Sequence, residues 1–205
     1  DFTFYVYSDH AELKKYEAKS VKDITIPSEA DGQPVTIICN GAFRDNSSIT
    51  AVIIPDSVVT IEPFAFYNCS SITDVTVGNG VKTVSNYAFY SCNNLVELTL
   101  GNSVVEIGEA AFAGCESLTE VTLPATVSLL KENAFSNCSA LVACTLSDEI
   151  TVLPVNAFSG CKSLRGITLP KNLESIEDNA FRECSALKSI TIPDSVKTIK
   201  PFAFA

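Results

Sequence analysis

The chain has 205 residues, and its 24 acidic against 14 basic side chains give a formal charge of −10 at pH 7. This length can bury a sizeable core in one large domain or two small ones, and a hydrophobic content of 46% excludes a disordered acidic tail. The negative charge argues against nucleic acid and anionic membranes, because both recruit Lys and Arg. No run approaches the ~20 apolar residues of a membrane span, and a single histidine, His10, leaves little for acid–base or metal chemistry.

The first 20 residues differ from the rest of the chain. Residues 2–7 are strand-like, residues 11–18 can pair back onto them, and His10 lies in an exposed turn between the two. We therefore expect residues 1–20 to form an N-terminal cap, followed by a repeat domain over residues 21–205. That domain begins with a strand at residues 24–27, and an insertion within residues 28–33 carries the turn signal Asp31-Gly32.

A 23-residue repeat dominates residues 21–205. The pair Ala-Phe recurs eight times at this interval, with cysteine three residues later in six copies. A unit this short cannot bury its own apolar residues, whereas stacked units can, so the repeat predicts a solenoid. The phenylalanines are Phe43, Phe66, Phe89, Phe112, Phe135, Phe158, Phe181 and Phe204.

Each unit contains a short alternation of apolar and polar residues, as in Val121-Thr122-Leu123, which predicts a strand with one buried face. We expect these strands to form a parallel sheet, and each Ala-Phe-x-x-Cys stretch to make one helical or 3₁₀ turn. The last expected strand, near Ile190, is left as an open edge. We expect the native protein to continue beyond Ala205, so that the solenoid is truncated there and its uncapped end can contact other molecules. The inward strand pairs are Val52/Ile54, Val75/Val77, Leu98/Leu100, Val121/Leu123, Cys144/Leu146, Ile167/Leu169 and Ile190/Ile192.

Residues 190–204 (ITIPDSVKTIKPFAF), nearly repeated at residues 52–66, resemble the BspA-like leucine-rich repeats, also called the Treponema pallidum type. Residues 24–38 are similar to the opening of many such domains, and the resemblance covers residues 21–205. It implies an α/β repeat fold: a right-handed solenoid with a parallel sheet on the concave face and short turns on the convex side. It also implies secreted or surface proteins, mostly of host-associated bacteria and some protozoa, that act in adhesion and protein binding. No shared active site comes with the resemblance.

The eight cysteines are interpreted as buried thiols that act as small hydrophobic groups. Six of them occupy one position of successive coils, so their side chains run parallel, which disfavours both a disulfide and a tetrahedral metal site. Cys144 replaces an apolar residue on the buried strand face, and we expect Cys39 to be partly exposed and the most readily modified. We predict no cofactor and no metal. The six are Cys69, Cys92, Cys115, Cys138, Cys161 and Cys184.

The outward strand face offers one candidate binding surface. Asp74, Glu97 and Glu120 occupy one column, and Thr76, Thr99 and Thr122 occupy its neighbour. Parallel strands would place the carboxylates close to the ~5 Å separation of a retaining glycosidase pair. They could also hold a weakly bound cation, since hard cations favour oxygen ligands, or form only a solvated acidic strip beside a threonine ladder.

Four aromatic residues offer a second candidate surface. Phe64 and Tyr67 lie three residues apart around Phe66, and Tyr87 and Tyr90 repeat this arrangement one coil later. Residues three apart share one side of a helical turn, so they are expected to form one patch on the convex or lateral surface. The patch is local, because the next three units carry Ala, Asn or Ser at these positions: Ala110, Ala113, Asn133, Ser136, Asn156 and Ser159. Exposed aromatic clusters mark interaction sites, although the rings can also lie flat over neighbouring coils without binding anything.

These features predict a non-enzymatic, extracellular or cell-surface binding module that presents a rigid repeat surface to a protein or glycan. The acidity suggests a protein partner with basic surface, and neither nucleic acid nor membrane insertion is expected. One alternative is a passive spacer or stalk that displays another domain. A more remote alternative is a glycoside hydrolase acting through Asp74, Glu97 and Glu120.

Overall fold

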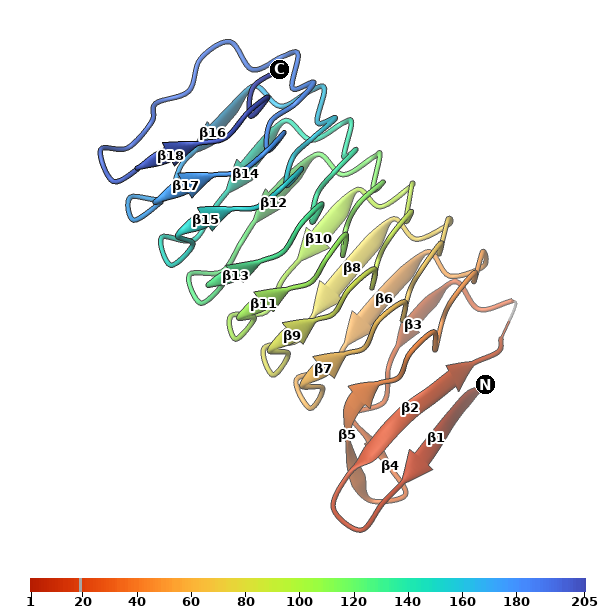
Figure 1. Ribbon diagram of the computed structural model, residues 1–205. Helices are drawn as coiled ribbons and strands as arrows, with labels where there is room; N and C mark the ends of the chain where they lie inside the picture. The colour runs from red at the N-terminus through yellow and green to blue at the C-terminus, as the bar shows by residue number, and fades with distance from the viewer. Residues whose placement is uncertain (19) are drawn as a thin grey trace.

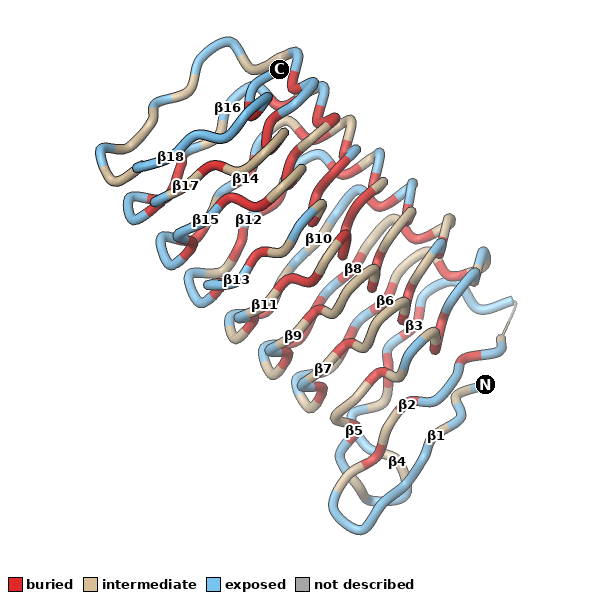
Figure 2. The backbone as a smooth tube through the Cα atoms, in the orientation of Figure 1, coloured by how far each residue is buried: buried red, intermediate tan, exposed pale blue. Residues whose placement is uncertain are grey.

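The computed structural model describes residues 1–18 and 20–205 and shows an elongated solenoid preceded by a β-hairpin (Figure 1). We number the coils 1 to 8 by their Ala-Phe pair, so that coil 1 contains Phe43 and coil 8 contains Phe204. Buried positions recur at the same places in successive coils (Figure 2). The predicted solenoid of 23-residue units is therefore confirmed.

The first row of strands is the one predicted from the alternating segments. All its pairings are parallel, and from β6 onward each residue pairs with its copy 23 positions away, as in Asp74 with Glu97. The row comprises β3 (Asp23–Thr25), β6 (Ala51–Ile54), β8 (Asp74–Val77) and β10 (Glu97–Thr99) in one sheet, and β12 (Glu120–Thr122), β14 (Ala143–Thr145) and β16 (Gly166–Thr168) in another.

A second row of mostly two-residue strands lies in the segments between the first-row strands and the Ala-Phe turns, where no strands were predicted. It also divides into two sheets. In this row Glu177 N donates to Leu153 O at 2.9 Å, but Pro154, at the equivalent position one coil earlier, has no N–H, and here the ladder breaks. The row comprises β5 (Gln33–Ile38), β7 (Thr60–Ile61), β9 (Thr83–Val84), β11 (Glu106–Ile107) and β13 (Leu129–Leu130), then β15 (Val152–Leu153), β17 (Ser175–Ile176) and β18 (Thr198–Ile199).

The predicted helical or 3₁₀ turns are wrong, because none of the described residues is helical. In coils 1 to 7 the Ala-Phe turn instead has a left-handed residue two positions before the phenylalanine and another two positions after it, as at Phe64 (φ 60°) and Asn68 (φ 55°). Tyr67 N donates back to Phe64 O within the turn, whereas Phe66 N donates forward to Ala88 O of the next coil at 2.7 Å. A helix needs consecutive right-handed residues, so this alternation excludes one.

Two stacked columns fill the core. The phenylalanine rings of successive coils lie nearly parallel, with centroid separations from 4.5 to 5.7 Å. Beside them, each repeat cysteine donates its S–H to a phenylalanine carbonyl of the preceding coil, as in Cys115 Sγ to Phe89 O at 3.4 Å. All eight cysteines are free, and the thiols predicted to be buried are so, but the column cysteines also act as hydrogen-bond donors.

The N-terminal hairpin consists of β1 (Phe2–Val6) and β2 (Ala11–Tyr16), which pair antiparallel. β2 pairs parallel with β5, and the Tyr16 ring lies 5.3 Å from the ring of Phe43. Ala11 and Leu13 are fully buried. The hairpin thus extends the second row of strands, while β4 (Glu29–Ala30), in the predicted insertion, pairs antiparallel with β5.

The first row has two irregularities. Between β10 and β12 no ladder is formed, and at this point the residue after the strand changes from Gly101 to Pro124. A Cβ on Gly101 would lie 2.2 Å from Gly78 O, so the ring of Pro124 cannot make the same close approach. Residues 187–192 are not a strand, which corrects the prediction at Ile190; neighbouring β16 offers Gly166, which has no side chain for cross-strand packing.

Candidate functional site: two exposed surfaces on the solenoid

The acidic column of Asp74, Glu97 and Glu120 lies on the outer face of the first strand row. Asp74 and Glu97 are direct register partners, as predicted, whereas Glu120 begins β12, across the broken ladder. Both glutamates are exposed, and Asp74 is half-buried, with its carboxylate accepting a hydrogen bond from Thr73 Oγ1. The structure therefore brings two of the three carboxylates together directly and sets the third apart.

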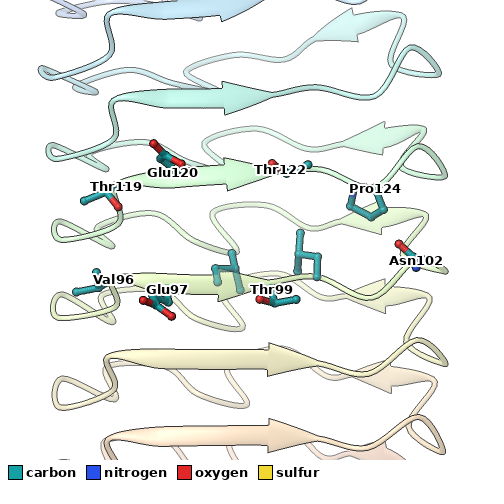
Figure 3. A pocket seen from close by; sticks show the side chains of 10 residues that line it. Val96, Glu97, Thr99, Asn102, Thr119, Glu120, Thr122 and Pro124 are labelled. Carbon is teal, nitrogen blue, oxygen red and sulfur yellow. The ribbon is translucent and has the colours of Figure 1, made fainter.

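A cleft of about 570 Å³ occupies the gap between β10 and β12. Glu97 and Glu120 lie near the starts of the two strands, with Thr99 and Thr122 further along them (Figure 3). Leu98, expected to point fully inward, is only half-buried and lines the cleft. The break thus adds apolar surface between two carboxylates, a feature that the regular 23-residue spacing could not predict.

Three carboxylates elsewhere on the solenoid form ion pairs with lysines of the next coil. Lys131 Nζ lies 2.5 Å from Glu106 Oε1, Lys171 Nζ lies 2.8 Å from Asp148 Oδ2, and Lys197 Nζ lies 2.9 Å from Glu174 Oε1. Among the residues that the structure describes, the acidic column forms no such ion pair. Like charges opposite one another destabilise a sheet, so this column weakens the fold that carries it.

The geometry of the acidic column is unlike that of a hydrolase. The two glutamates are exposed and flank an open cleft, so no water-excluded site surrounds them. In the described part of the chain, no group of three or more His, Cys, Asp or Glu residues is arranged to hold a metal ion.

The aromatic patch of Phe64, Tyr67, Tyr87 and Tyr90 is a two-by-two array of half-buried rings. Phe64 stacks on Tyr87 and Tyr67 stacks on Tyr90, each at 5.3 Å, while rings within one coil are 5.7 to 5.8 Å apart. Arg44 covers the coil 1 end, with Cζ 4.9 Å from the Tyr67 ring centroid. The four rings form one patch, as one interpretation of the sequence predicted, and they also lie against one another across the coils, as the other predicted.

Two residues of the aromatic patch have a costly backbone conformation. Phe64 (φ 60°) and Tyr87 (φ 58°) are left-handed, at a position that coils 5, 6 and 7 fill with Asn133, Asn156 and Asn179. Asparagine tolerates this conformation, whereas it is unusual for a bulky ring. Phe202 (φ 57°) has the same conformation at this position in coil 8, so aromatic side chains recur there despite the local backbone preference.

Cys39 is partly exposed, as predicted, but its environment disfavours reaction. Its Sγ lies 3.7 Å from Glu12 Oε2, and partial burial together with the carboxylates of Glu12 and Glu62 raises the pKa of the thiol to about 12. The thiolate is the reactive form of cysteine. The other seven cysteines are buried, so the statement that Cys39 is the most readily modified of the eight stays a prediction.

His10 is only partly exposed, contrary to prediction. Its ring stacks on Tyr7 at 4.6 Å, and its Nδ1 lies 2.8 Å from Asp9 Oδ1. The hydrogen bond to Asp9 raises the pKa of the imidazole. The sequence analysis missed this stacking, and it missed Arg44, whose position one residue after Phe43, equivalent to Tyr67 and Tyr90, was the available signal.

Comparison with known families decides the relationship of the chain. The family described as BspA type leucine rich repeat region matches residues 12–142 and 82–205, in six copies. The chain belongs to the BspA-type leucine-rich-repeat family. The repeat spacing, the stacked phenylalanines and the parallel strand rows are thus properties of a leucine-rich-repeat solenoid.

Solved structures of similar proteins agree with this fold. A leucine-rich repeat protein from Bacteroides ovatus is 30% identical, with a TM-score of 0.89, over 98% of this chain and 54% of that chain. The Treponema pallidum leucine rich repeat protein is 26% identical, with a TM-score of 0.88, over 100% of this chain and 97% of that one. This BspA-type chain therefore spans about half the length of the B. ovatus protein.

A third solved structure bears on location. A leucine rich cell surface protein from Faecalibacterium prausnitzii is 27% identical, with a TM-score of 0.66, over 99% of this chain and 72% of that chain. A search of curated protein sequences gives no match. Within the described residues, no helix has the length and apolar character needed to cross a membrane.

Proposed function

We propose that this BspA-type chain is a non-enzymatic, protein-binding module of a secreted or cell-surface protein, with a role in adhesion. The outer face of the first strand row, around the acidic column, is the proposed binding surface, and its partner presents a basic segment. The observation that carries this proposal is the alignment of three acidic residues at the starts of successive strands, none of which forms an ion pair within the described residues.

The surface suits such a partner in shape as well as in charge. The strand ladders hold its side chains on a rigid frame, so little conformational entropy is lost on binding. The half-buried Leu98 lines the cleft between β10 and β12 together with Glu97 and Glu120. An arginine or lysine of the partner can lay its aliphatic stem on this apolar floor while its charged end lies near the carboxylates.

The charge on this face changes along the solenoid, which sharpens the proposal. The acidic residues belong to coils 3 to 5, whereas exposed Arg165 and Lys188 precede the corresponding column positions in coils 7 and 8. A basic segment is therefore attracted to the first half of the face and repelled from the last coils. This asymmetry gives the partner a preferred position.

The test begins with a binding screen against purified extracellular-matrix and host-surface proteins. Each protein that binds is titrated against a variant carrying Asp74→Asn, Glu97→Gln and Glu120→Gln, which keeps side-chain shape and removes three charges. The matched control, Glu29→Gln with Glu132→Gln and Glu149→Gln, removes the same charge from exposed sites elsewhere. We expect about a tenfold loss of affinity in the first variant and almost none in the control.

Two results would redirect the proposal. Equal losses in the two variants would show that net charge, and not this face, governs binding. A folded wild-type chain that binds none of the proteins favours the spacer or stalk alternative. Location is tested separately: antibody labelling of intact source cells should detect the chain at the surface or in the medium.

A further inference from the structure

A groove of about 440 Å³ crosses coils 3 to 6 on the turn side of the solenoid, next to the aromatic patch. Tyr90 lies at its coil 3 end and Lys162 at its coil 6 end. The volume falls within the range of small-ligand sites. At ~4.8 Å per coil the groove is roughly 14 Å long, so it suits a short chain of linked units better than a single small molecule.

The groove exists because a column of rings stops. Tyr67 and Tyr90 stack at 5.3 Å, and the equivalent residue in coil 4 is Ala113, whose side chain is a single methyl group. The column of rings therefore ends in a step at Tyr90, which lines the groove. The Tyr90 ring forms the wall of this step, and small residues, Ala113, Gly114 and Gly160, lie along the groove.

The wall of the groove is held rigidly. Tyr90 packs on Tyr67 and, at 5.8 Å, on Tyr87, whose hydroxyl donates to Glu109 Oε1 at 2.6 Å. Arg44 closes the other end of the array, against Phe64 and Tyr67. The ring face that borders the groove is therefore preorganised, and ordering it on binding costs little.

Polar groups line the groove beyond the ring. The side chains of Asn93, Glu116 and Asn137 supply acceptors, and Asn137 and Lys162 supply donors, whereas the Ser139 hydroxyl donates to Glu116 O. A Cβ on Gly160 would lie 2.3 Å from Asn137 Oδ1, so glycine is needed for the Asn137 amide to occupy its place. Lys162 is the one cationic residue of this lining, whereas binding a chain of phosphates requires several. The lining also has no apolar pocket of the kind that anchors a peptide side chain.

We propose that this groove binds an oligosaccharide, with one sugar ring stacked on Tyr90. Sugars combine an apolar C–H face, which packs on an aromatic ring, with hydroxyls that donate and accept hydrogen bonds. The hydroxyls of the next sugars meet Asn93, Glu116 and Asn137. The site lies on the turn side, apart from the acidic column, and does not depend on the proposed protein partner.

The test is a glycan array probed with the purified chain, followed by calorimetric titration of the oligosaccharides that bind. Tyr90→Ala removes the stacking face, and Ala113→Tyr continues the ring column and fills the step. Tyr90→Phe keeps the ring and is the matched control, while Glu116→Gln alters one exposed polar group if a larger change perturbs folding. Thermal unfolding checks each variant.

We expect at least one oligosaccharide to bind, with affinity about tenfold or more lower in Tyr90→Ala and Ala113→Tyr and changed by no more than about twofold in Tyr90→Phe. The acidic-column variant should bind the same oligosaccharide normally, so the two proposals succeed or fail separately. A folded wild-type chain that binds no oligosaccharide, or binding that survives both Tyr90→Ala and Ala113→Tyr, would overturn the proposal.

Discussion

Two columns of stacked aromatic rings run along this solenoid, and they differ in length and exposure. The core column continues from Phe43 to Phe204, and its members through Phe181 are at most 1% exposed. The aromatic patch has similar ring separations but is half-exposed and ends after coil 3. Stacking follows from the repeat alone, so it is the interruption of a column, not the stacking, that marks a surface available for recognition.

The two columns also differ in what the backbone requires. Phe66 and Phe89 have negative φ values, whereas Phe64 and Tyr87 are both left-handed, with positive φ values. That conformation costs about 1–2 kcal/mol for a side chain with a Cβ. The core column therefore stabilises the fold without backbone strain, and the aromatic patch carries a cost that asparagine at the same position would reduce.

The largest expected effect is on the core column. Phe112→Ala removes a fully buried ring from the middle of the stack and should lower the free energy of unfolding by about 3–5 kcal/mol. Phe112→Leu refills part of the cavity and should cost clearly less. Urea denaturation followed by circular dichroism measures both, and similar losses in the two variants would contradict a packing role for the ring.

The thiol column should respond less strongly. Cys115→Ala removes a small buried group and its hydrogen bond to Phe89 O, at an expected cost of about 1–2 kcal/mol. Cys39→Ala, at a half-exposed site without a repeat partner, is the matched control and should cost less. A Cys115→Ala variant as stable as the wild type would show that the thiol hydrogen bonds contribute nothing.

Alkaline pH should weaken the core through the same thiols. Burial raises the pKa of Cys69 and of Cys138 to about 12, from the ordinary value of 9.0. A group whose pKa is raised in the folded state stabilises the fold below its unfolded pKa and loses that contribution as pH rises through its folded pKa. The free energy of unfolding should therefore fall between about pH 9 and 12, and it should fall less in Cys69→Ala with Cys138→Ala; equal slopes would contradict this.

The smallest expected effect is at the strained turn. Phe64→Asn loses ring stacking worth about 0.5–1.5 kcal/mol but relieves a left-handed phenylalanine, so stability should change by less than about 1 kcal/mol. Phe66→Asn, two residues later in the core column, should be severely destabilising because it buries an amide. Thermal denaturation distinguishes them, and comparable losses would show that Phe64 is structural.

The structural features that could be predicted from the sequence are those that the 23-residue repeat produces in every coil. The 23-residue spacing predicted the first row of strands as far as β16, the phenylalanine column and the grouping of the four aromatic residues, because each depends on equivalent positions coming together. It did not predict the left-handed turns, because the left-handed position two residues before the phenylalanine holds different residue types, such as Phe64, Ala110 and Asn133. Nor did it predict the cleft, which arises from one exchange of Gly101 for Pro124 between neighbouring coils.

The candidate surfaces also combine features that follow from the repeat with features that do not. Register placed Asp74 beside Glu97 as expected, but the broken ladder removed Glu120 from the series. The groove beyond Tyr90 depends on Ala113 being small, and the absence of a ring is a weak signal in a sequence. Regular features of a solenoid are thus readable from its repeat, whereas its irregular features, which form the candidate sites, require the structure.

The most direct test compares two adjacent residues, Phe89 of the core column and Tyr90 of the aromatic patch. Each is changed to alanine, and the free energy of unfolding is measured by urea denaturation. We expect Phe89→Ala to cost about 3–5 kcal/mol and Tyr90→Ala no more than about 1.5 kcal/mol, because Tyr90 loses mainly its ring stacking. Equal losses would contradict the account, because the aromatic patch would then be a structural column like the one beneath it.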